Sequence, residues 1–300
     1  MRRFLLAGSL AMLMMGAAAP LALAHNPDRS GESGQALQVV GLTADSRLVT
    51  FTSERPRSVS SIGKVAGLKG DQRLVGVDYR IQDGKLYGVG NKGGIYTLSA
   101  SSAKATKVSQ LSVPLAGTKF GVDFNPAANR LRVISDSGQN LRHNIDDQMG
   151  MPAAGTTAVD GRLTYPPATA PATGVTAAAY TNNDTDPTTA TTLFDLDTSL
   201  DQISVQSPAN AGSLAPTGKI GVDADSSAGF DIYSPRRDGR ATSATALATL
   251  QVGQKSGLYR VDLLTGGAKA VGTFPSRHQI VDLAIQLDQR RFRAAAAPAG

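Results

Sequence analysis

The chain has 300 residues and a formal net charge of +6, and 41% of its residues are hydrophobic, 18% charged and 5% aromatic. This length allows one or two domains with a buried core, and the hydrophobic content argues against a wholly disordered chain. The absence of Cys excludes disulfides, thiolate metal sites and cysteine nucleophiles, and three His argue against a His-rich metal centre. The acids are 22 Asp and only two Glu, a bias that favours turns and a β architecture over long helices.

The N-terminus is typical of a secretory signal peptide. Two arginines at positions 2 and 3 precede a nearly all-apolar segment at 4–19, and Ala22-Leu23-Ala24 provides an A-x-A cleavage pattern. We therefore predict a signal peptide at 1–24, a flexible mature N-terminus at 25–35 and a periplasmic or secreted protein without a membrane span after cleavage. The alternative is an uncleaved membrane anchor, since the apolar segment is close to spanning length.

Short strands bounded by Gly, Asn and Asp follow one another along the rest of the chain, as in antiparallel hairpins. Three strands open the mature chain, with no first strand before them, at 36–42, 47–52 and 58–65. Units that begin with an apolar strand ending in Val-Asp then follow. Their strands are expected at 74–79, 83–89, 94–98 and 105–109; at 120–124, 129–134 and 140–145; and at 220–224, 228–233, 257–262 and 268–272. A weaker copy covers 176–180, 192–197 and 202–206, and a lone strand covers 279–286.

These units predict an all-β fold, a β-propeller of five four-stranded blades over residues 36–287, because their size and strand number are typical of propeller blades. The lone C-terminal strand and the three N-terminal strands complete one another, so their pairing would close the ring and remove open sheet edges. Two long segments, 148–173 and 234–253, are expected to be loops on one rim. Six blades, the alternative, would need four further strands within these two segments.

Three segments of the chain resemble a known bacterial family. They are Gly-Val-Asp-Phe-Asn-Pro-Ala-Ala-Asn-Arg-Leu-Arg-Val-Ile-Ser at 121–135, Leu-Tyr-Gly-Val at 86–89 and Thr-Gly-Lys-Ile-Gly-Val-Asp-Ala at 217–224. In them the chain resembles the family called domain of unknown function 4394, and the likeness covers roughly residues 37–287. The resemblance implies an exported, propeller-like protein with no established activity, and it assigns no catalytic or binding residue.

The repeated aspartates are the leading candidates for a site. The first strand of a propeller blade lines the central channel, so Asp78, Asp123, Asp223 and Asp282 are expected at one level, with Ala179 as the gap. Several carboxylates without a nearby Lys or Arg suit Ca²⁺, which prefers oxygen ligands. The alternative, which we favour, is that each Asp accepts hydrogen bonds from backbone N–H groups of its own hairpin.

A second candidate for calcium is the segment 182–186, which places oxygen ligands at alternating positions, including Asp184 and Asp186. It lacks the Gly and the distal Glu of the helix-loop-helix calcium motif, so an ordinary polar turn is favoured. We therefore expect no cofactor, and calcium at one of these two groups of aspartates is the alternative.

The sequence contains none of the common catalytic motifs. No Gly-x-Ser-x-Gly elbow or phosphate-binding Gly loop occurs, and neither Glu32 nor Glu54 is placed as the acid of a glycosidase. We therefore predict a monomeric, non-catalytic binding or scaffold module whose partner is a protein, a glycan or a small ligand. The alternative is a hydrolase or lyase that acts at the channel mouth on a sugar or lactone with Ca²⁺. The tail at 288–300, basic and then Ala-rich, is predicted to be disordered rather than to bind nucleic acid.

Overall fold

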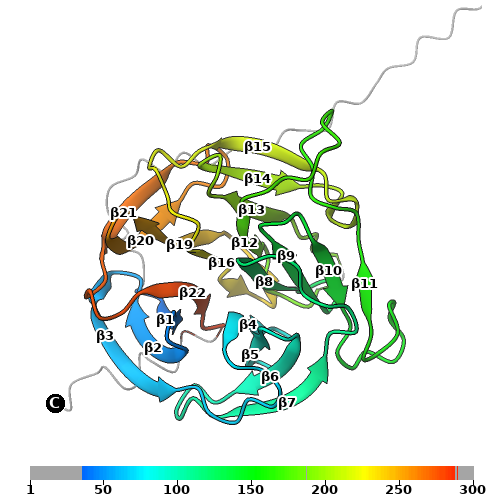
Figure 1. The fold of residues 1–300 in the computed structure, drawn as a ribbon, viewed down its shortest axis with the longest axis horizontal. Coiled ribbons are helices and arrows are strands. Elements are labelled where there is room, and N and C mark those ends of the chain that lie inside the picture. The colour runs from blue at the N-terminus through cyan, green and yellow to red at the C-terminus, as the bar shows by residue number, and fades with distance from the viewer. Residues whose placement is uncertain (1–35, 187, 288, 290–300) are drawn as a thin grey trace, which may run out of the picture. The chain divides into compact units, whose positions relative to one another are not determined.

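The computed structural model describes residues 36–186, 188–287 and 289. Within them, five four-stranded antiparallel sheets form a ring, which is a five-bladed β-propeller (Figure 1). The predicted fold is thus confirmed, and the six-blade alternative is wrong. The predicted signal peptide at 1–24, the segment 25–35 and all of the tail at 288–300 except residue 289 lie outside the described residues. No helix in the described part of the chain is long and apolar enough to cross a membrane.

Each blade extends from an inner strand near the axis to an outer strand at the perimeter (Figure 1). From the axis outward, blade 1 consists of β4 (Leu74–Arg80), β5 (Lys85–Gly90), β6 (Gly94–Leu98) and β7 (Ala105–Gln110). In the same direction, blade 2 consists of β8 (Phe120–Asn125), β9 (Arg130–Ser135), β10 (Asn140–His143) and β11 (Thr157–Val159). Blade 3 consists of β12 (Val175–Tyr180), β13 (Leu193–Asp197), β14 (Gln202–Gln206) and β15 (Leu214–Lys219).

Blades 4 and 5 complete the ring in the same inner-to-outer order. Blade 4 consists of β16 (Ala228–Tyr233), β19 (Thr245–Val252), β20 (Lys255–Val261) and β21 (Ala268–Thr273). Blade 5 consists of β22 (Ile280–Ile285), β1 (Gln38–Thr43), β2 (Arg47–Thr52) and β3 (Arg55–Lys64). A two-stranded hairpin, β17 (Arg236–Arg237) and β18 (Arg240–Ala241), and a short 3-10 helix, η1 (Ala209–Ala211), lie outside the five sheets.

The place of a strand in its blade follows from its residue pattern. Inner strands such as β4 and β12 are buried along their whole length, because the neighbouring blades cover both of their faces. They therefore lack the alternation of a half-exposed strand, whereas the outer strand β7 shows it, with residues of its second face exposed. Tight turns lead from the inner to the second strand, and Gly84 at φ +66° and Asn129 at φ +53° supply the left-handed residue in blades 1 and 2.

Blade 5 joins the two ends of the described chain. β22 pairs with β1 in antiparallel register, with Val39 opposite Ile285 and Val40 opposite Ala284. Beyond β22, the side-chain Oε1 of Gln289 accepts a hydrogen bond from the backbone N–H of Gln38 (2.8 Å). The predicted closure of the ring by the C-terminal strand is therefore confirmed.

The strand assignments in the second half of the chain differ from the prediction. The segments at 192–197 and 202–206 contain the second and third strands of blade 3, not the third and fourth, and β15 is its outer strand. The segment 220–224, expected to be the inner strand of blade 4, is a connection, because Gly221 at φ +78° interrupts the extended backbone. The inner strand is β16 instead, and the expected loops at 148–173 and 234–253 contain β11 and β19.

Removing the closing strand should destabilise the whole ring. A chain truncated before Gln279 leaves β1 as an exposed edge and removes Leu283 and Ile285 from the apolar cluster that they form with Val39 and Phe51. We expect loss of soluble protein, or unfolding at a much lower urea concentration. Truncation after Gln289 keeps β22 and is the matched control. Equal urea midpoints for the two truncated chains would show that closure contributes nothing.

Candidate functional site

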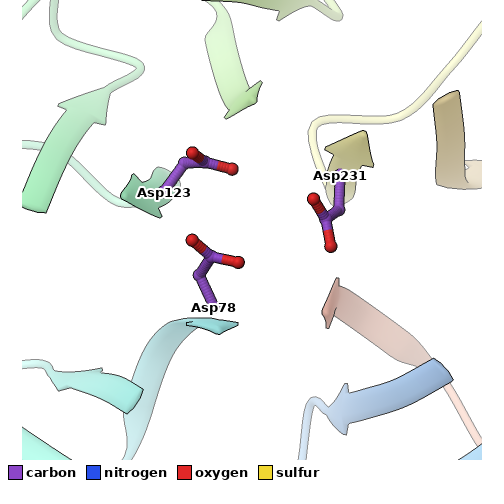
Figure 2. A group of neighbouring side chains, drawn as sticks. All are labelled: Asp78, Asp123 and Asp231. Carbon is purple, nitrogen blue, oxygen red and sulfur yellow. The ribbon is translucent and has the colours of Figure 1, made fainter. Parts of the chain in front are cut away.

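Four aspartates on inner strands lie at the centre of the ring. Asp78 is on β4, Asp123 on β8, Asp231 on β16 and Asp282 on β22, and Ala179 of β12 has the corresponding place in blade 3. The four aspartates are buried, with 4% to 6% of their surface exposed. Figure 2 shows the carboxylates of Asp78, Asp123 and Asp231 around the space between their strands.

The structure brings three of the four predicted aspartates to the axis and leaves Asp223 apart. Asp223 is exposed in the connection between β15 and β16, and Asp231 occupies the axial position that was predicted for Asp223. The pattern Gly, an apolar residue and Asp occurs at 76–78, 121–123 and 229–231, but also at 221–223, so the sequence pattern alone does not select Asp231 over Asp223.

The carboxylate of Asp78 links its own blade to the next one. Its Oδ1 accepts a hydrogen bond from the backbone N–H of Tyr79 (2.6 Å), and its Oδ2 accepts one from the N–H of Phe124 in blade 2 (2.7 Å). In blade 2, Asp123 in turn accepts a hydrogen bond from the N–H of Tyr180 in blade 3 (3.2 Å). Two successive junctions between blades are therefore bridged by one carboxylate each.

The same arrangement continues in blades 4 and 5. Asp231 accepts hydrogen bonds from the backbone N–H of Ile232 and from that of Ile285 in blade 5, both at 2.6 Å. Asp282 accepts them from the N–H of Leu283 (2.9 Å) and of Val77 in blade 1 (2.7 Å). The interpretation that we favoured places these bonds within the aspartate's own hairpin, but four of the seven bonds to the axial aspartates come from a neighbouring blade. The aspartates thus brace blades against one another.

Three of these carboxylates also come close enough to share an ion. One oxygen from each of Asp78, Asp123 and Asp231 lies within 4.8 Å of the other two. Calcium would have to compete with the backbone donors that bond these oxygens, and it would need ionised ligands. Burial raises the pKa of Asp78 and Asp123 well above the usual range, and repulsion between the carboxylates raises it further. The arrangement therefore suits bracing better than cation binding.

The second predicted calcium candidate is also surrounded by hydrogen-bond donors. Asp184 accepts hydrogen bonds from the backbone N–H of Asp186 (2.9 Å) and of Ala241 (2.7 Å). Asp186 accepts bonds from the hydroxyl and N–H of Thr188 and pairs with Arg240 (2.6 Å), and these contacts lower its pKa to about 2. The two carboxylates hold their segment to the β17–β18 hairpin, and the guanidinium of Arg240 disfavours a second cation there.

A pocket of about 220 Å³ opens at the axis, on the face of the ring where the inner strands begin. We call this face the N-terminal face and this cavity the central pocket; all five inner strands contribute residues to its wall. Its two cationic residues are Arg73 and Lys119, and no carboxylate lines it. Within the described residues, neither side chain forms a hydrogen bond or ion pair. The residues that bring hydroxyls to the pocket are Thr43, Thr118, Thr176 and Ser227.

Sequence reasoning missed both cations of the central pocket. The signal that could have identified them is a basic residue immediately before two successive inner strands, Arg73 before β4 and Lys119 before β8. Because equivalent positions of successive blades surround the axis of a propeller, residues at this repeat position converge.

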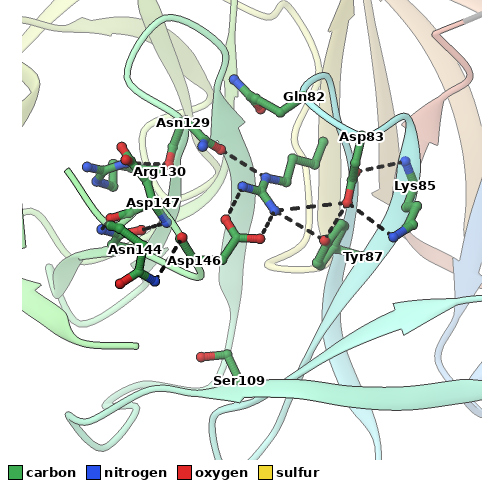
Figure 3. Close-up of polar contacts among 12 residues, drawn as sticks. Gln82, Asp83, Lys85, Tyr87, Ser109, Asn129, Arg130, Asn144, Asp146 and Asp147 are labelled. Atoms are coloured by element: carbon green, nitrogen blue, oxygen red, sulfur yellow. Dashed lines mark hydrogen bonds and ion pairs between the residues drawn. The ribbon is translucent and has the colours of Figure 1, made fainter. Parts of the chain in front are cut away.

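At the opposite end of the inner strands, two basic side chains, Arg80 and Arg130, are paired. Arg80, at the end of β4, donates hydrogen bonds to Asn129 (2.9 Å) and to Asp146 (2.9 Å). Asn129 and Asp146, which are labelled in Figure 3, both lie in blade 2. Arg130 pairs with Asp147 (3.0 Å) in the same region. The bond from Arg80 holds the pKa of Asp146 below its usual range. These charges therefore stabilise the junction between blades 1 and 2, in contrast to the unpaired cations of the central pocket.

The family model for Domain of unknown function (DUF4394) matches residues 47–284. The chain belongs to this family. No curated protein sequence matches the chain. The family match confirms the predicted resemblance, and it leaves the function of this DUF4394 propeller to be argued from its site.

Several solved structures resemble this DUF4394 propeller in fold. A chain of a nidogen/laminin complex is 11% identical with a TM-score of 0.45, and the alignment covers 85% of this chain and 99% of that one. A protein of unknown function from Bacteroides thetaiotaomicron is 11% identical with a TM-score of 0.44, covering 83% of this chain and 64% of that one. An auxiliary nutrient binding protein from Bacteroides ovatus is 11% identical with a TM-score of 0.38, covering 77% and 57%. None of these likenesses assigns a function.

We expect the stability of this DUF4394 propeller to depend on pH through Asp231. Burial raises the pKa of this carboxyl from 3.8 to about 7. Between these two values, the unfolded chain releases a proton that the folded chain keeps, so the unfolded chain is favoured as the pH rises. At pH values below the pKa that Asp231 has in the unfolded chain, Asp231 makes its full contribution to the free energy of unfolding. This contribution falls by about 4 kcal/mol as the pH rises through the folded pKa, at about 1.4 kcal/mol per pKa unit.

Urea unfolding of the protein and of Asp231→Asn across this pH range measures that contribution. The variant cannot ionise at position 231, so its stability should fall less steeply with pH than that of the unmodified protein. Asp238→Asn is the control, since Asp238 is exposed in the β17–β18 turn and Asn tolerates its positive φ. Equal slopes for all three proteins would contradict a raised pKa at Asp231.

A second prediction concerns calcium at the axis. Asp78→Asn and Asp123→Asn each keep one oxygen acceptor, so we expect losses on the order of 1 kcal/mol per lost hydrogen bond. Asp78 should be the more sensitive, because both of its oxygens accept bonds, whereas Asp123 accepts one from Tyr180. For both single variants and for the double variant, the shift in melting temperature should be the same with calcium as with a chelator. A loss of calcium-dependent stabilisation in either single variant would support the metal site instead.

Proposed function

We propose that the protein is an exported, non-catalytic binding module that holds a small anionic ligand in the central pocket. The observation that carries the proposal is the pairing state of Arg73 and Lys119. Both line a concave site at the axis, and neither has a side-chain partner within the described residues. Two cations without counter-charges in one pocket attract an anion, and their donors suit carboxylate or phosphate oxygens.

The remaining lining residues support a ligand that also carries hydroxyl groups. Four Thr and Ser residues line the pocket beside the two cations. The hydroxyls of Thr43, Thr118 and Thr176 donate to Asp45, Asp136 and Thr198, and their oxygens can still accept a hydrogen bond. Among the described residues, the hydroxyl of Ser227 has no partner and can both donate and accept. The apolar residues Leu74, Val75 and Phe120 form the rest of the nearby wall. Pockets with an apolar wall and a few convergent polar groups are typical of small-ligand sites. A sugar acid combines the carboxylate and hydroxyls that this lining would recognise.

Catalysis at the channel mouth has less support. A hydrolase or lyase would need an acid or base in the pocket, and no Asp, Glu or His is among its lining residues. The aspartates of the axis lie further along the inner strands, where backbone N–H groups of neighbouring blades bond to them. We therefore propose that binding requires neither calcium nor a chemical step.

The proposed location and partner class rest on the sequence. The predicted signal peptide at 1–24 supports export to the periplasm or the outside of the cell. A ligand of the cell envelope, a glycan or a small acid, then fits better than a nucleic acid. We propose that the protein acts as a monomer, since the ring surrounds its own axial pocket with residues of one chain.

Replacing the two cations should abolish binding without unfolding the ring. We expect Arg73→Ala and Lys119→Ala each to weaken the binding of galacturonate about tenfold or more, because hydrogen bonds to charged groups contribute about 1.5–3 kcal/mol. Isothermal titration calorimetry with galacturonate, galactose and inorganic phosphate measures this. Lys104→Ala, in the β6–β7 turn at the other end of blade 1, is the matched control and should bind as the unmodified protein does.

The salt dependence of the same titrations separates charge recognition from shape. Affinity for galacturonate should fall as the salt concentration rises, because the pocket is open to solvent and its charges are screened. Galactose, which lacks the carboxylate, should bind more weakly than galacturonate. If no anionic probe binds, or if the double variant Arg73→Ala with Lys119→Ala binds galacturonate unchanged, the central pocket is not the proposed site.

A further inference from the structure

A second, larger pocket lies on the N-terminal face between blades 4 and 5. Its volume is about 550 Å³, and we call it the lateral pocket. It is formed by the β19–β20 turn at 253–254, by the connection from β21 to β22 at 274–279, and by Arg57 of β3. Both of these connections lie at the end of the ring where the inner strands begin, so the lateral pocket and the central pocket open on the same face.

The lateral pocket has the same sign of charge as the central one. Arg57 and Lys255 are exposed cations in its lining, His278 is its third basic residue, and no carboxylate lines it. Within the described residues, the side chains of Arg57 and Lys255 form no hydrogen bond or ion pair. Arg277, beside the pocket, donates a hydrogen bond to Nε2 of His278 (3.1 Å), which keeps this nitrogen as an acceptor.

Neutral hydrogen-bonding groups outnumber the charges in the lateral pocket. Three amides and three hydroxyls line it, from Gln251, Gln254, Gln279, Thr273, Ser256 and Ser276. The hydroxyl of Ser256 is buried, and the amide nitrogens of Gln251 and Gln279 donate to Gly253 and Gln251. Gln254, Thr273 and Ser276 remain to donate to and accept from sugar hydroxyl groups. Phe274 is buried in the core and offers no exposed ring on which a nucleic-acid base could stack. The lining therefore fits a polymer in which charges are separated by hydroxyl groups.

The two pockets are neighbours across one short turn. The backbone N–H of Ala44, in the β1–β2 turn, donates a hydrogen bond to the backbone oxygen of Gln279 (3.0 Å). Ala44 lines the central pocket and Gln279 lines the lateral pocket. The nearby carboxylate of Asp45 is occupied by the hydroxyl of Thr43 (2.5 Å) and by Arg47 (3.1 Å). The linings of the two pockets are thus joined by a direct hydrogen bond, and the acid beside this bond is paired.

We infer that the central and lateral pockets are two subsites of one extended site, and that its ligand is an acidic oligosaccharide. The inference rests on the proposed function, because it takes the central pocket as the site of one acidic sugar. It adds that Arg57 and Lys255 hold another acidic unit of the same chain. Linking two bound units makes the second binding event intramolecular, so affinity increases with chain length.

Titration of galacturonate oligomers of increasing length tests the extended site. We expect the unmodified protein to bind an oligomer that spans both pockets at least about tenfold more tightly than the monomer, as effective concentration predicts. The double variant Arg57→Ala with Lys255→Ala should keep the monomer affinity and lose the gain with length. Lys269→Ala is the matched control, because Lys269 is exposed on the outer strand β21 of the same blade and does not line the pocket.

The outcomes separate this inference from the proposed function. If the monomer binds through Arg73 and Lys119 but longer oligomers bind no more tightly, or the gain survives in the Arg57 and Lys255 double variant, the extended site is wrong and the central pocket stands. If neither monomer nor oligomer binds, both are wrong. Inorganic polyphosphate of equal charge is the last probe, and binding as tight as that of the oligomer would contradict an oligosaccharide ligand. Circular dichroism of each variant confirms that the ring is folded.

Discussion

The ring depends on buried carboxylates that join the inner strand of one blade to that of the next. An inner strand is paired along one edge only, so the N–H groups of its other edge face the axis and need acceptors that its own sheet does not provide. Asp78, Asp231 and Asp282 each accept one such bond from the following blade. Because an unsatisfied buried donor is costly, each carboxylate both satisfies a donor and fixes the distance between two blades. Burial raises the pKa of these groups and favours their protonated state, which limits the repulsion that four ionised carboxylates would create.

Blade 3 shows what replaces a brace where the aspartate is missing. Ala179 offers no side-chain acceptor to blade 4, and it belongs instead to an apolar cluster with Phe194, Phe230 and Ile232. At the axis, hydrophobic burial therefore holds this junction in place of a hydrogen bond to an inner-strand carboxylate. On the other side of blade 3, Arg132 of blade 2 donates a hydrogen bond to the hydroxyl of Tyr180 (3.2 Å). Each junction around the ring thus has its own balance of polar and apolar contacts, although the five blades share one strand order.

The sequence predicted the number of blades and the closure of the ring, because strand periodicity and turn residues are local signals that recur in each unit. It failed in blade 4 because Val-Asp at 222–223 imitates the end of an inner strand, and only the conformation at Gly221 reveals that this segment is a connection. Three of the four aspartates at the axis were predicted, but their bonds to neighbouring blades were not, since a repeat indicates equivalent positions and not contacts between units. The lateral pocket was missed for the same reason, because Arg57 and Lys255 lie far apart in sequence and only the ring brings them to one cavity. The cations of the central pocket, Arg73 and Lys119, precede successive inner strands, and the prediction did not use this equivalence.

The braced axis also determines how a ligand can be bound on the N-terminal face. The wall of the central pocket consists of the beginnings of the inner strands, and the aspartate bridges hold these strands together a few residues further along. Such a pocket needs no closure around its ligand, so little ordering cost reduces the affinity. The lateral pocket is built mainly from turns and connections, which tolerate sequence change better than inner strands do. Under the proposed function, recognition of one anionic unit is tied to the braced geometry of the ring itself, whereas the inferred selection among longer ligands depends on connections that can vary without disturbing the axis.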